Sequence, residues 1–138
     1  MGFHQEVLTF EPRGPGLLEI TNDVARVVER ARVPRGLCNV FVQHTSASLV
    51  IQENADPSAR RDLEAFFERL APEGAAWYTH TAEGPDDCPA HLRSALTRTS
   101  EQIPVVDARL GLGTWQGLYL FEHRHRPGTR RVVVSVLG

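Results

Sequence analysis

Histidines gather with carboxylates in two short segments of this 138-residue chain. Both segments fall in predicted turns rather than on solvent-facing helices. Imidazoles beside carboxylates suit a divalent metal, because they supply nitrogen ligands and acceptors that fix the imidazole tautomer. The residues concerned are His44, Ser46, Glu53, Asn54 and Asp56 in the first segment, and His80, Glu83, Asp86, Asp87 and His91 in the second.

The spacing of the histidines is a weak signal by itself. His44, His80 and His91 match no compact metal motif, such as two histidines one helical turn apart with a glutamate between them. They could meet only through tertiary folding. A single histidine in a turn is more often a surface or hydrogen-bonded side chain. That interpretation stays open for these three, and it is our expectation for the other three histidines.

Other polar motifs favour structural roles. Ser46 and Ser48 lie near His44, but no Gly-x-Ser-x-Gly elbow surrounds either serine, so a serine nucleophile is the weaker interpretation. The segment 111–114 (Gly-Leu-Gly-Thr) lacks the lysine of a P-loop and is expected to be a turn. The alternating charged residues of segment 122–126 are typical of a solvent-facing strand.

The charge balance of the chain restricts its partners. The formal net charge is −2, which gives no basic field for nucleic acid. All 15 basic residues are arginines, so Schiff-base chemistry and lysine general bases are excluded. Contacts to phosphate groups would therefore come from arginine, backbone amides or a metal.

The length of 138 residues predicts a single domain over residues 1–138, and the apolar periodicity predicts an α+β fold. We expect a mixed, largely antiparallel sheet packed with two or three helices. The last two strands are predicted to form an antiparallel hairpin around the turn 126–129. Strands are predicted over 3–10, 37–43, 48–52, 103–107, 115–125 and 130–137, and helices are predicted to begin near Thr21, Asp56 and Pro89.

The sequence also favours a cytoplasmic protein that does not enter a membrane. Its first residues lack the charge-then-apolar layout of a secretory signal. No apolar run approaches the roughly 18 residues that span a bilayer. Cys38 and Cys88 are too few for a disulfide scaffold and are expected to be reduced thiols.

Three motif blocks follow one another along nearly the whole chain. They are Gln43-His44-Thr45-Ser46-Ala47-Ser48-Leu49 with Glu53-Asn54-x-Asp56, then His80-x-x-Glu83-Gly84-x-Asp86-Asp87-x-Pro89-Ala90-His91, and finally Gly113-Thr114-Trp115-Gln116-Gly117 with Glu122-x-Arg124. Such long, ordered blocks are far more specific than any short motif. They resemble the signatures of the YjbQ family, also called the secondary thiamine-phosphate synthase family. One departure is Cys88, where the family usually has Met.

The resemblance implies a compact α+β protein that assembles as a homotrimer, with a metal-capable pocket near the subunit boundary. It also implies a synthase activity that joins a pyrimidine diphosphate to a thiazole phosphate and releases pyrophosphate. The implied metal ligands are His44, His80 and His91. The implied catalytic residues are His44, Glu53, Asp56, Glu83 and Asp87, and the implied substrate-binding residues are Ser46, Asn54, Asp86, Thr114, Gln116, Glu122 and Arg124. Arg93 is a further expected substrate-binding residue, because in a chain without lysine an arginine is a natural contact for phosphate.

Three functions follow from these expectations. The first is the synthase-like transferase, in which arginines or a divalent cation would neutralise the leaving pyrophosphate. The second is a metal-dependent hydrolase, since histidine-rich sites favour zinc whereas diphosphate chemistry more often uses magnesium. The third is a trimeric module that binds a small phosphorylated metabolite without catalysis.

Overall fold

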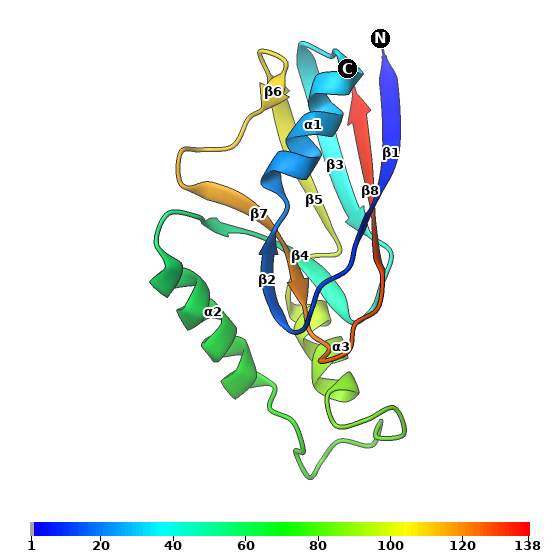
Figure 1. The fold of residues 1–138 in the computed structure, drawn as a ribbon, viewed down its shortest axis with the longest axis vertical. Helices are drawn as coiled ribbons and strands as arrows, with labels where there is room; N and C mark the ends of the chain where they lie inside the picture. The colour runs from blue at the N-terminus through cyan, green and yellow to red at the C-terminus, as the bar shows by residue number, and fades with distance from the viewer. Residues whose placement is uncertain (1) are drawn as a thin grey trace.

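The fold is built from two antiparallel β-sheets and three helices, in a computed structural model that describes residues 2–138 (Figure 1). The five-stranded sheet has the order β1-β8-β3-β5-β6 and the three-stranded sheet has the order β2-β7-β4. This confirms the predicted α+β fold. The elements are β1 (Phe3–Phe10), β2 (Gly16–Glu19), α1 (Thr21–Ala31), β3 (Arg35–Val42), β4 (Ala47–Glu53), α2 (Pro57–Leu70), α3 (Asp87–Leu96), β5 (Ser100–Val106), β6 (Arg109–Leu110), β7 (Gln116–Glu122) and β8 (Arg130–Leu137).

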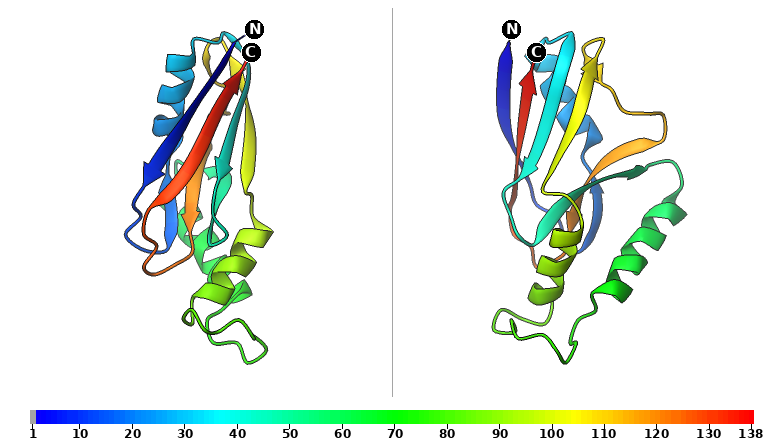
Figure 2. Two further views of the ribbon diagram at one scale, coloured as in Figure 1. Left: turned by 90° about the vertical axis from the view of Figure 1, so that its right-hand side faces the viewer. Right: turned by 180° about the vertical axis from the view of Figure 1, so that it is seen from behind.

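The main core lies between α1 and the inner faces of the two sheets. Alternate residues of β8 point inward, and Val132, Val134 and Val136 are completely buried, as period-2 patterning predicts. α1 contributes Val24, Val27 and Val28 from one face. Figure 2 shows α1 against one face of the five-stranded sheet and the opposite face uncovered.

Side-chain capping explains where α2 begins but not where α1 begins. α2 begins as predicted, with the Asp56 carboxylate accepting a hydrogen bond from the Ser58 amide at 2.9 Å and with Pro57 in the first turn. α1 begins at Thr21 as predicted, but its N-cap residue is Ile20 and no side chain caps it. The Thr21 hydroxyl instead accepts a hydrogen bond from the Leu118 amide of β7.

The predicted hairpin of the last two strands was wrong. β7 pairs with β2 and β4, whereas β8 pairs with β1 and β3 in the other sheet. Residues 117–122 of β7 are all buried, because the main core covers one face and α2 covers the other. β8 instead has one outward face, so it belongs to the sheet whose far side is uncovered.

A buried ion pair connects the two sheets where β7 ends and β8 begins. The Arg130 guanidinium donates to both carboxylate oxygens of Glu122, at 2.6 and 2.5 Å. It also donates to the backbone and side-chain oxygens of Ser46 in the β3–β4 loop. The side chains of Glu122 and Arg130 are 0% and 6% exposed, which corrects the expectation of a solvent-facing strand over 122–126.

No helix within residues 2–138 combines the length and the apolar composition needed to cross a membrane.

We predict that Glu122→Gln lowers the free energy of unfolding by about 3–5 kcal/mol, because it leaves the Arg130 charge buried without a counter-charge. Urea denaturation measures the change. The matched control is Asp23→Asn, which breaks the exposed pair of Asp23 with Arg26 and should cost less than about 1 kcal/mol. Equal losses in the two variants would contradict a structural role for the buried pair.

Candidate metal centre and adjoining groove

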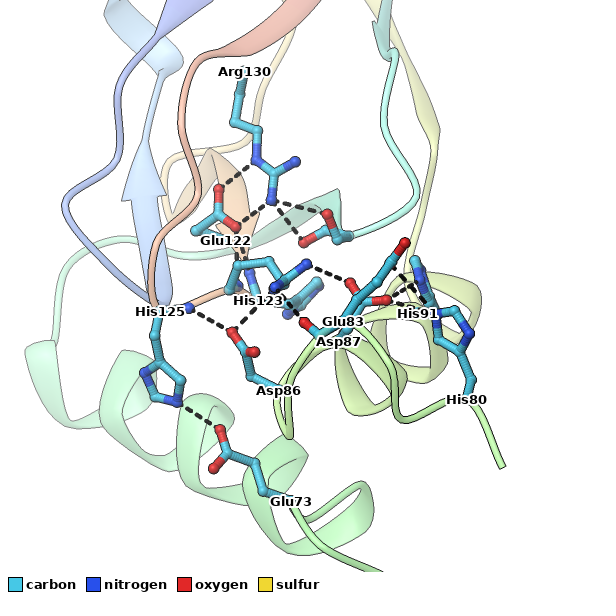
Figure 3. Close-up of polar contacts among 12 residues, drawn as sticks. Glu73, His80, Glu83, Asp86, Asp87, His91, Glu122, His123, His125 and Arg130 are labelled. Carbon is cyan, nitrogen blue, oxygen red and sulfur yellow. Dashed lines mark hydrogen bonds and ion pairs between the residues drawn. The ribbon is translucent and has the colours of Figure 1, made fainter. Parts of the chain in front are cut away.

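Two histidines and two carboxylates converge at the start of α3 (Figure 3). Asp87 Oδ2 lies 2.6 Å from His80 Nε2 and 2.9 Å from His91 Nε2. Glu83 Oε2 lies 3.6 Å from His80 Nε2. One ligand atom from each of these residues lies within 4.8 Å of the others, so we call His80, Glu83, Asp87 and His91 the four-residue cluster.

The helix begins earlier than the sequence suggested, and this creates half of the cluster. α3 starts at Asp87 rather than at Pro89. Asp87 and His91 are therefore one turn apart on the same helix face, where side chains four residues apart are neighbours. His80 and Glu83 come from the preceding loop.

Arg124 anchors the cluster from behind. Its guanidinium donates to Asp87 Oδ1, to Asp86 Oδ2 at 3.0 Å and to the Glu83 carbonyl at 3.1 Å. The backbone amide of His125 also donates to Asp86, at 2.9 Å. One oxygen of Asp87 thus binds Arg124, and the other faces the two histidines.

Both aspartates are held as carboxylates. Burial by itself would raise the pKa of Asp87, but the hydrogen bond with His80 and the charges of His91 and Arg124 outweigh it and lower that pKa. For Asp86, burial is likewise outweighed by the His125 amide and Arg124, which lower the pKa. Two fixed negative charges therefore lie at this end of α3.

The protonation pattern of His91 fits a bound cation. Its Nδ1 lies 2.9 Å from the Thr45 carbonyl, which can only accept, so Nδ1 carries a proton. Without a cation, Nε2 must also carry a proton to make its 2.9 Å contact with the Asp87 carboxylate favourable, and a divalent cation between the two atoms could replace that proton. A carbonyl that fixes the tautomer in this way is typical of metal-binding histidines. The mixed nitrogen and oxygen donors fit zinc or a similar divalent metal.

His44 lies outside the four-residue cluster within one chain. Its Nε2 accepts a hydrogen bond from the Arg131 amide at 2.8 Å. Burial and the charges of Arg130 and Arg131 lower the pKa of His44. It lines a groove of about 660 Å³ together with His91, and this size suits a small-molecule ligand. Its roles as a metal ligand and catalytic residue stay predictions.

A second group of predicted site residues lies at the far end of the three-stranded sheet. Glu53 of β4 pairs with Gln116 of β7, whereas the cluster adjoins the opposite end, where Ala47 pairs with Glu122. Seven-residue strands place these two ends about 20 Å apart. The structure thus keeps this group away from the cluster within one chain; its members are Glu53, Asn54, Asp56, Thr114 and Gln116.

Three further predicted substrate-binding residues have internal partners. Ser46 and Glu122 bind Arg130 at the junction between the sheets. Arg93 donates to the Ala71 carbonyl at 2.7 Å and thereby connects α3 to the end of α2. Their contacts to substrate stay predictions.

A buried serine–histidine pair lies beneath the site and was missed from the sequence. The Ser48 hydroxyl lies 2.9 Å from His123 Nε2, and the Thr97 hydroxyl donates to Ser48 at 2.5 Å. His123 is only 2% exposed, and burial together with the charges of Arg93 and Arg130 lowers its pKa to about 3. No local signal marked this histidine, because its burial follows from the placement of β7 between α2 and the core.

We predict that His123 makes the fold sensitive to mild acid. Its pKa is about 3 when folded and near 6.5 when unfolded, so between these values the unfolded chain binds more protons. The contribution of His123 to the free energy of unfolding is therefore fully present well above pH 6.5. It falls by roughly 1.4 kcal/mol per pH unit below that pH. Urea denaturation between pH 7 and 5 measures how the free energy of unfolding depends on pH. His123→Asn should lose the part of this pH dependence that comes from His123, and the control His4→Gln should keep it. Identical slopes in both variants would contradict the prediction.

Comparisons with known proteins agree with the three motif blocks. A family model described as "UPF0047 protein YjbQ-like" matches residues 6–138. A UPF0047 protein of Synechocystis is 56% identical over 135 residues, which covers 98% of this chain and 92% of that protein. The UPF0047 protein YjbQ of Escherichia coli O157:H7 is 39% identical over 137 residues, covering 99% of each chain.

Solved structures show the same fold. A YbjQ-like protein of unknown function from Sulfolobus solfataricus superposes with a TM-score of 0.90 and 25% identity, covering 99% of this chain and 97% of that one. The conserved hypothetical protein TT1486 from Thermus thermophilus gives a TM-score of 0.85 at 33% identity, covering 96% and 99%. The ordered motifs, the sequence matches and the shared fold together show that this chain belongs to the YjbQ-like UPF0047 family.

Proposed function

We propose that this chain is a metal-dependent hydrolase that acts on a small phosphorylated metabolite. The observation that carries the proposal is the His91 contact set, in which Nδ1 is held by the Thr45 carbonyl and Nε2 faces Asp87 and the rest of the cluster. The groove beside His91 gives a substrate access to the same point. Zinc is the cation that the two imidazoles favour.

In the proposed hydrolase, different residues would bind the cation and the phosphate group. His80, His91, Asp87 and Glu83 would hold the cation, which when bound lowers the pKa of water and neutralises phosphate charge. His44 presents Nδ1–H as a donor, because its Nε2 is occupied by the Arg131 amide. Burial lowers the pKa of His44, so the imidazole is neutral at pH 7 and can donate to a phosphate oxygen in the groove.

The synthase-like transferase is the second candidate. It is favoured by the carboxylate oxygens of Glu83 and Asp87, since magnesium with a diphosphate substrate prefers oxygen ligands. It is weakened by the arginines, because Arg93 and Arg124 are engaged with Ala71, Asp86 and Asp87. In that reaction the pyrophosphate charge would have to be neutralised mainly by the metal.

We predict that Asp87→Asn weakens zinc binding by at least about tenfold, because it removes a ligand and the partner that orients both histidines. Isothermal titration calorimetry of chelator-treated protein measures the affinity. Phosphate release from a panel of phosphate monoesters should fall in parallel. The matched control is Asp62→Asn on the exposed face of α2, which should leave both values unchanged.

The same samples separate the alternatives. Thiamine phosphate formed with magnesium and both phosphorylated substrates would favour the transferase over the hydrolase. A thermal shift with phosphate esters, but no turnover of any kind, would favour a binding module. Zinc affinity that is equal in wild type and Asp87→Asn would contradict the metal centre itself.

We propose further that the chain forms a homotrimer whose site is completed at the subunit boundary. A cyclic trimer needs two different surfaces that meet head to tail. Two separate exposed apolar surfaces support this arrangement. The outer surface of the five-stranded sheet presents Phe3, Val7, Leu37, Phe41 and Leu137, and the protruding α2–α3 region presents Phe66, Leu70, Trp77 and Leu96.

The trimer would also explain the divided motif residues. Glu53, Asp56 and Gln116 lie about 20 Å along the sheet from the cluster of their own chain. In a head-to-tail assembly this group of one subunit can face the groove of the next. The family motifs would then form one composite site from two chains.

We predict that the protein elutes at three times its 15.4 kDa mass and that Phe41→Glu dissociates it, because a charge would be buried in the apolar interface. Size-exclusion chromatography with light scattering measures both masses. Leu18→Glu, at an exposed apolar residue of β2 outside both surfaces, is the control and should stay trimeric. A monomeric wild type would contradict the proposal.

A cytoplasmic location fits the thiols. Cys38 and Cys88 are both free. Cys38 is fully buried, and burial raises its pKa to about 11, so it is an inert core thiol rather than a redox group.

A further inference from the structure

A cavity of about 480 Å³ lies between α2 and the loop that leads from β1 into β2. Figure 1 shows β2 next to α2, and the Leu17 amide of β2 donates to the Glu64 carboxylate of α2 at 2.8 Å. The cavity shares no lining residue with the groove beside His44. Its charged lining residues are Glu11, Arg13, Arg60 and Glu64.

Arg60 of α2 is half-buried at this cavity and lacks a strong acceptor. It is one of four arginines within residues 2–138 whose side chains are not exposed. Arg124 and Arg130 bind carboxylates, and Arg93 donates to a backbone carbonyl at 2.7 Å. Arg60 has only a long contact, of 3.4 Å, with the Tyr119 hydroxyl. Since a charge withdrawn from water is costly unless it is paired, Arg60 offers hydrogen bonds that the chain itself does not use.

The carboxylate best placed to pair with Arg60 is held elsewhere. Glu64 lies four residues further along α2, the spacing at which opposite charges on a helix usually meet. Its Oε2 atom instead accepts the hydrogen bond from the Leu17 amide. Gly16 makes room for this contact, because a Cβ atom there would lie 2.7 Å from Glu64 Oε2. The loop thus draws Glu64 toward β2 and leaves Arg60 without a counter-charge.

Tyr119 fixes the orientation of the Arg60 guanidinium. The central carbon of the guanidinium lies 5.1 Å from the centre of the Tyr119 ring, within the range of a cation–π contact. The Nε atom of Arg60 is enclosed, so a ligand cannot reach it. The Nη1 atom makes no hydrogen bond within the described part of the chain and stays accessible. A guanidinium that is already positioned loses little conformational freedom when a ligand binds to it.

The remaining lining restricts the ligand to a singly charged acid with an apolar body. The formal charges of the four charged lining residues sum to zero, so the cavity does not attract a phosphate dianion as a basic pocket would. Arg13 is exposed and adds a second guanidinium from the loop. The volume is in the lower half of the range for small-molecule sites. The apolar lining residues are Pro12, Pro15, Leu17 and Leu18.

We propose that this cavity binds a small monocarboxylate, with its carboxylate on Arg60 and Arg13 and its apolar body against Pro12 and Pro15. Hydrogen bonds between a guanidinium and a carboxylate are charge-assisted and roughly twice as strong as those between neutral groups. The site is independent of the metal centre, because no residue of the four-residue cluster lines the cavity.

Isothermal titration calorimetry of the chelator-treated full chain tests the ligand class. The probes are benzoate, hexanoate, their uncharged amides benzamide and hexanamide, and inorganic phosphate. At least one of the two carboxylates should bind at one site per chain. Its amide and phosphate should bind at least about tenfold more weakly, the loss expected without a charge-assisted hydrogen bond. Absence of binding by both carboxylates, or equally tight binding of phosphate, would overturn the proposal.

Variants at the two arginines separate binding from folding. Arg60→Gln should weaken the carboxylate by at least about tenfold, because it removes the charged donor. Arg13→Gln, at an exposed position where the fold is not at risk, should also weaken it. Arg61→Gln is the matched control, since Arg61 is an exposed arginine of α2 that does not line the cavity. Unchanged affinity in Arg13→Gln, or an equal loss in Arg61→Gln, would overturn the proposal.

The arginine Nε–H groups give a measurement on the unaltered chain. Because Nε of Arg60 is enclosed, its proton is protected from exchange with water and can be observed by nuclear magnetic resonance. In protein labelled with nitrogen-15 arginine, the bound carboxylate should shift the Arg60 Nε resonance. It should leave the resonance of Arg93 Nε, which is also enclosed, in place. Binding of a carboxylate without a change at Arg60 would contradict the assigned site.

Discussion

The buried pair between Glu122 and Arg130 is the interaction on which the rest of the site depends. It closes the junction between the two sheets and fixes the chain where it leaves β7. Glu122 also accepts the amides of His123 and Arg124, so it sets the direction of the next residues. Arg124 can then reach Asp86 and Asp87, and Asp87 in turn contacts both histidines. Each of these polar contacts thus positions the residue that makes the next contact, from the buried pair to the two histidines.

This chain of contacts places different charged groups on the two sides of α3. On one side, Asp87 and Glu83 bring negative charge to two imidazoles and create an attractive point for a cation. On the other side, Arg93 and the buried His123 are among the residues that line a separate cavity. Asp86 lies between them, and the positive charge of Arg124 balances its negative charge. The two cavities are therefore electrostatically different although they are neighbours.

Local patterns predicted most of the secondary structure, because periodicity and capping act within a few residues. The start of α2 at Asp56 and Pro57 follows directly from amide capping, and the alternation in β8 gave its buried face. The hairpin prediction failed because strand pairing depends on which faces are covered. Only the complete fold shows that β7 is covered on both faces whereas β8 has an open side.

The sequence indicated which residue types the candidate site contains, but not which of these residues lie close together in the fold. His80 and His91 meet as the resemblance implied, whereas His44 is held by a backbone amide nearby and the Glu53 group is at the far end of the sheet. The Thr45 carbonyl and the earlier start of α3 have no sequence signal, since the first is backbone and the second depends on the contacts of Asp86 and Asp87. Long-range contacts such as Arg124 with Asp87 are fixed only by the tertiary fold.

Anomalous diffraction from crystals grown with zinc can show directly whether the four-residue cluster binds a metal ion. Data collected on both sides of the zinc absorption edge locate the ion without reference to activity. We expect one zinc-specific peak per chain, at a position where His80, His91 and at least one of Asp87 and Glu83 bind the ion. A zinc-saturated crystal with no peak at these four residues would contradict it.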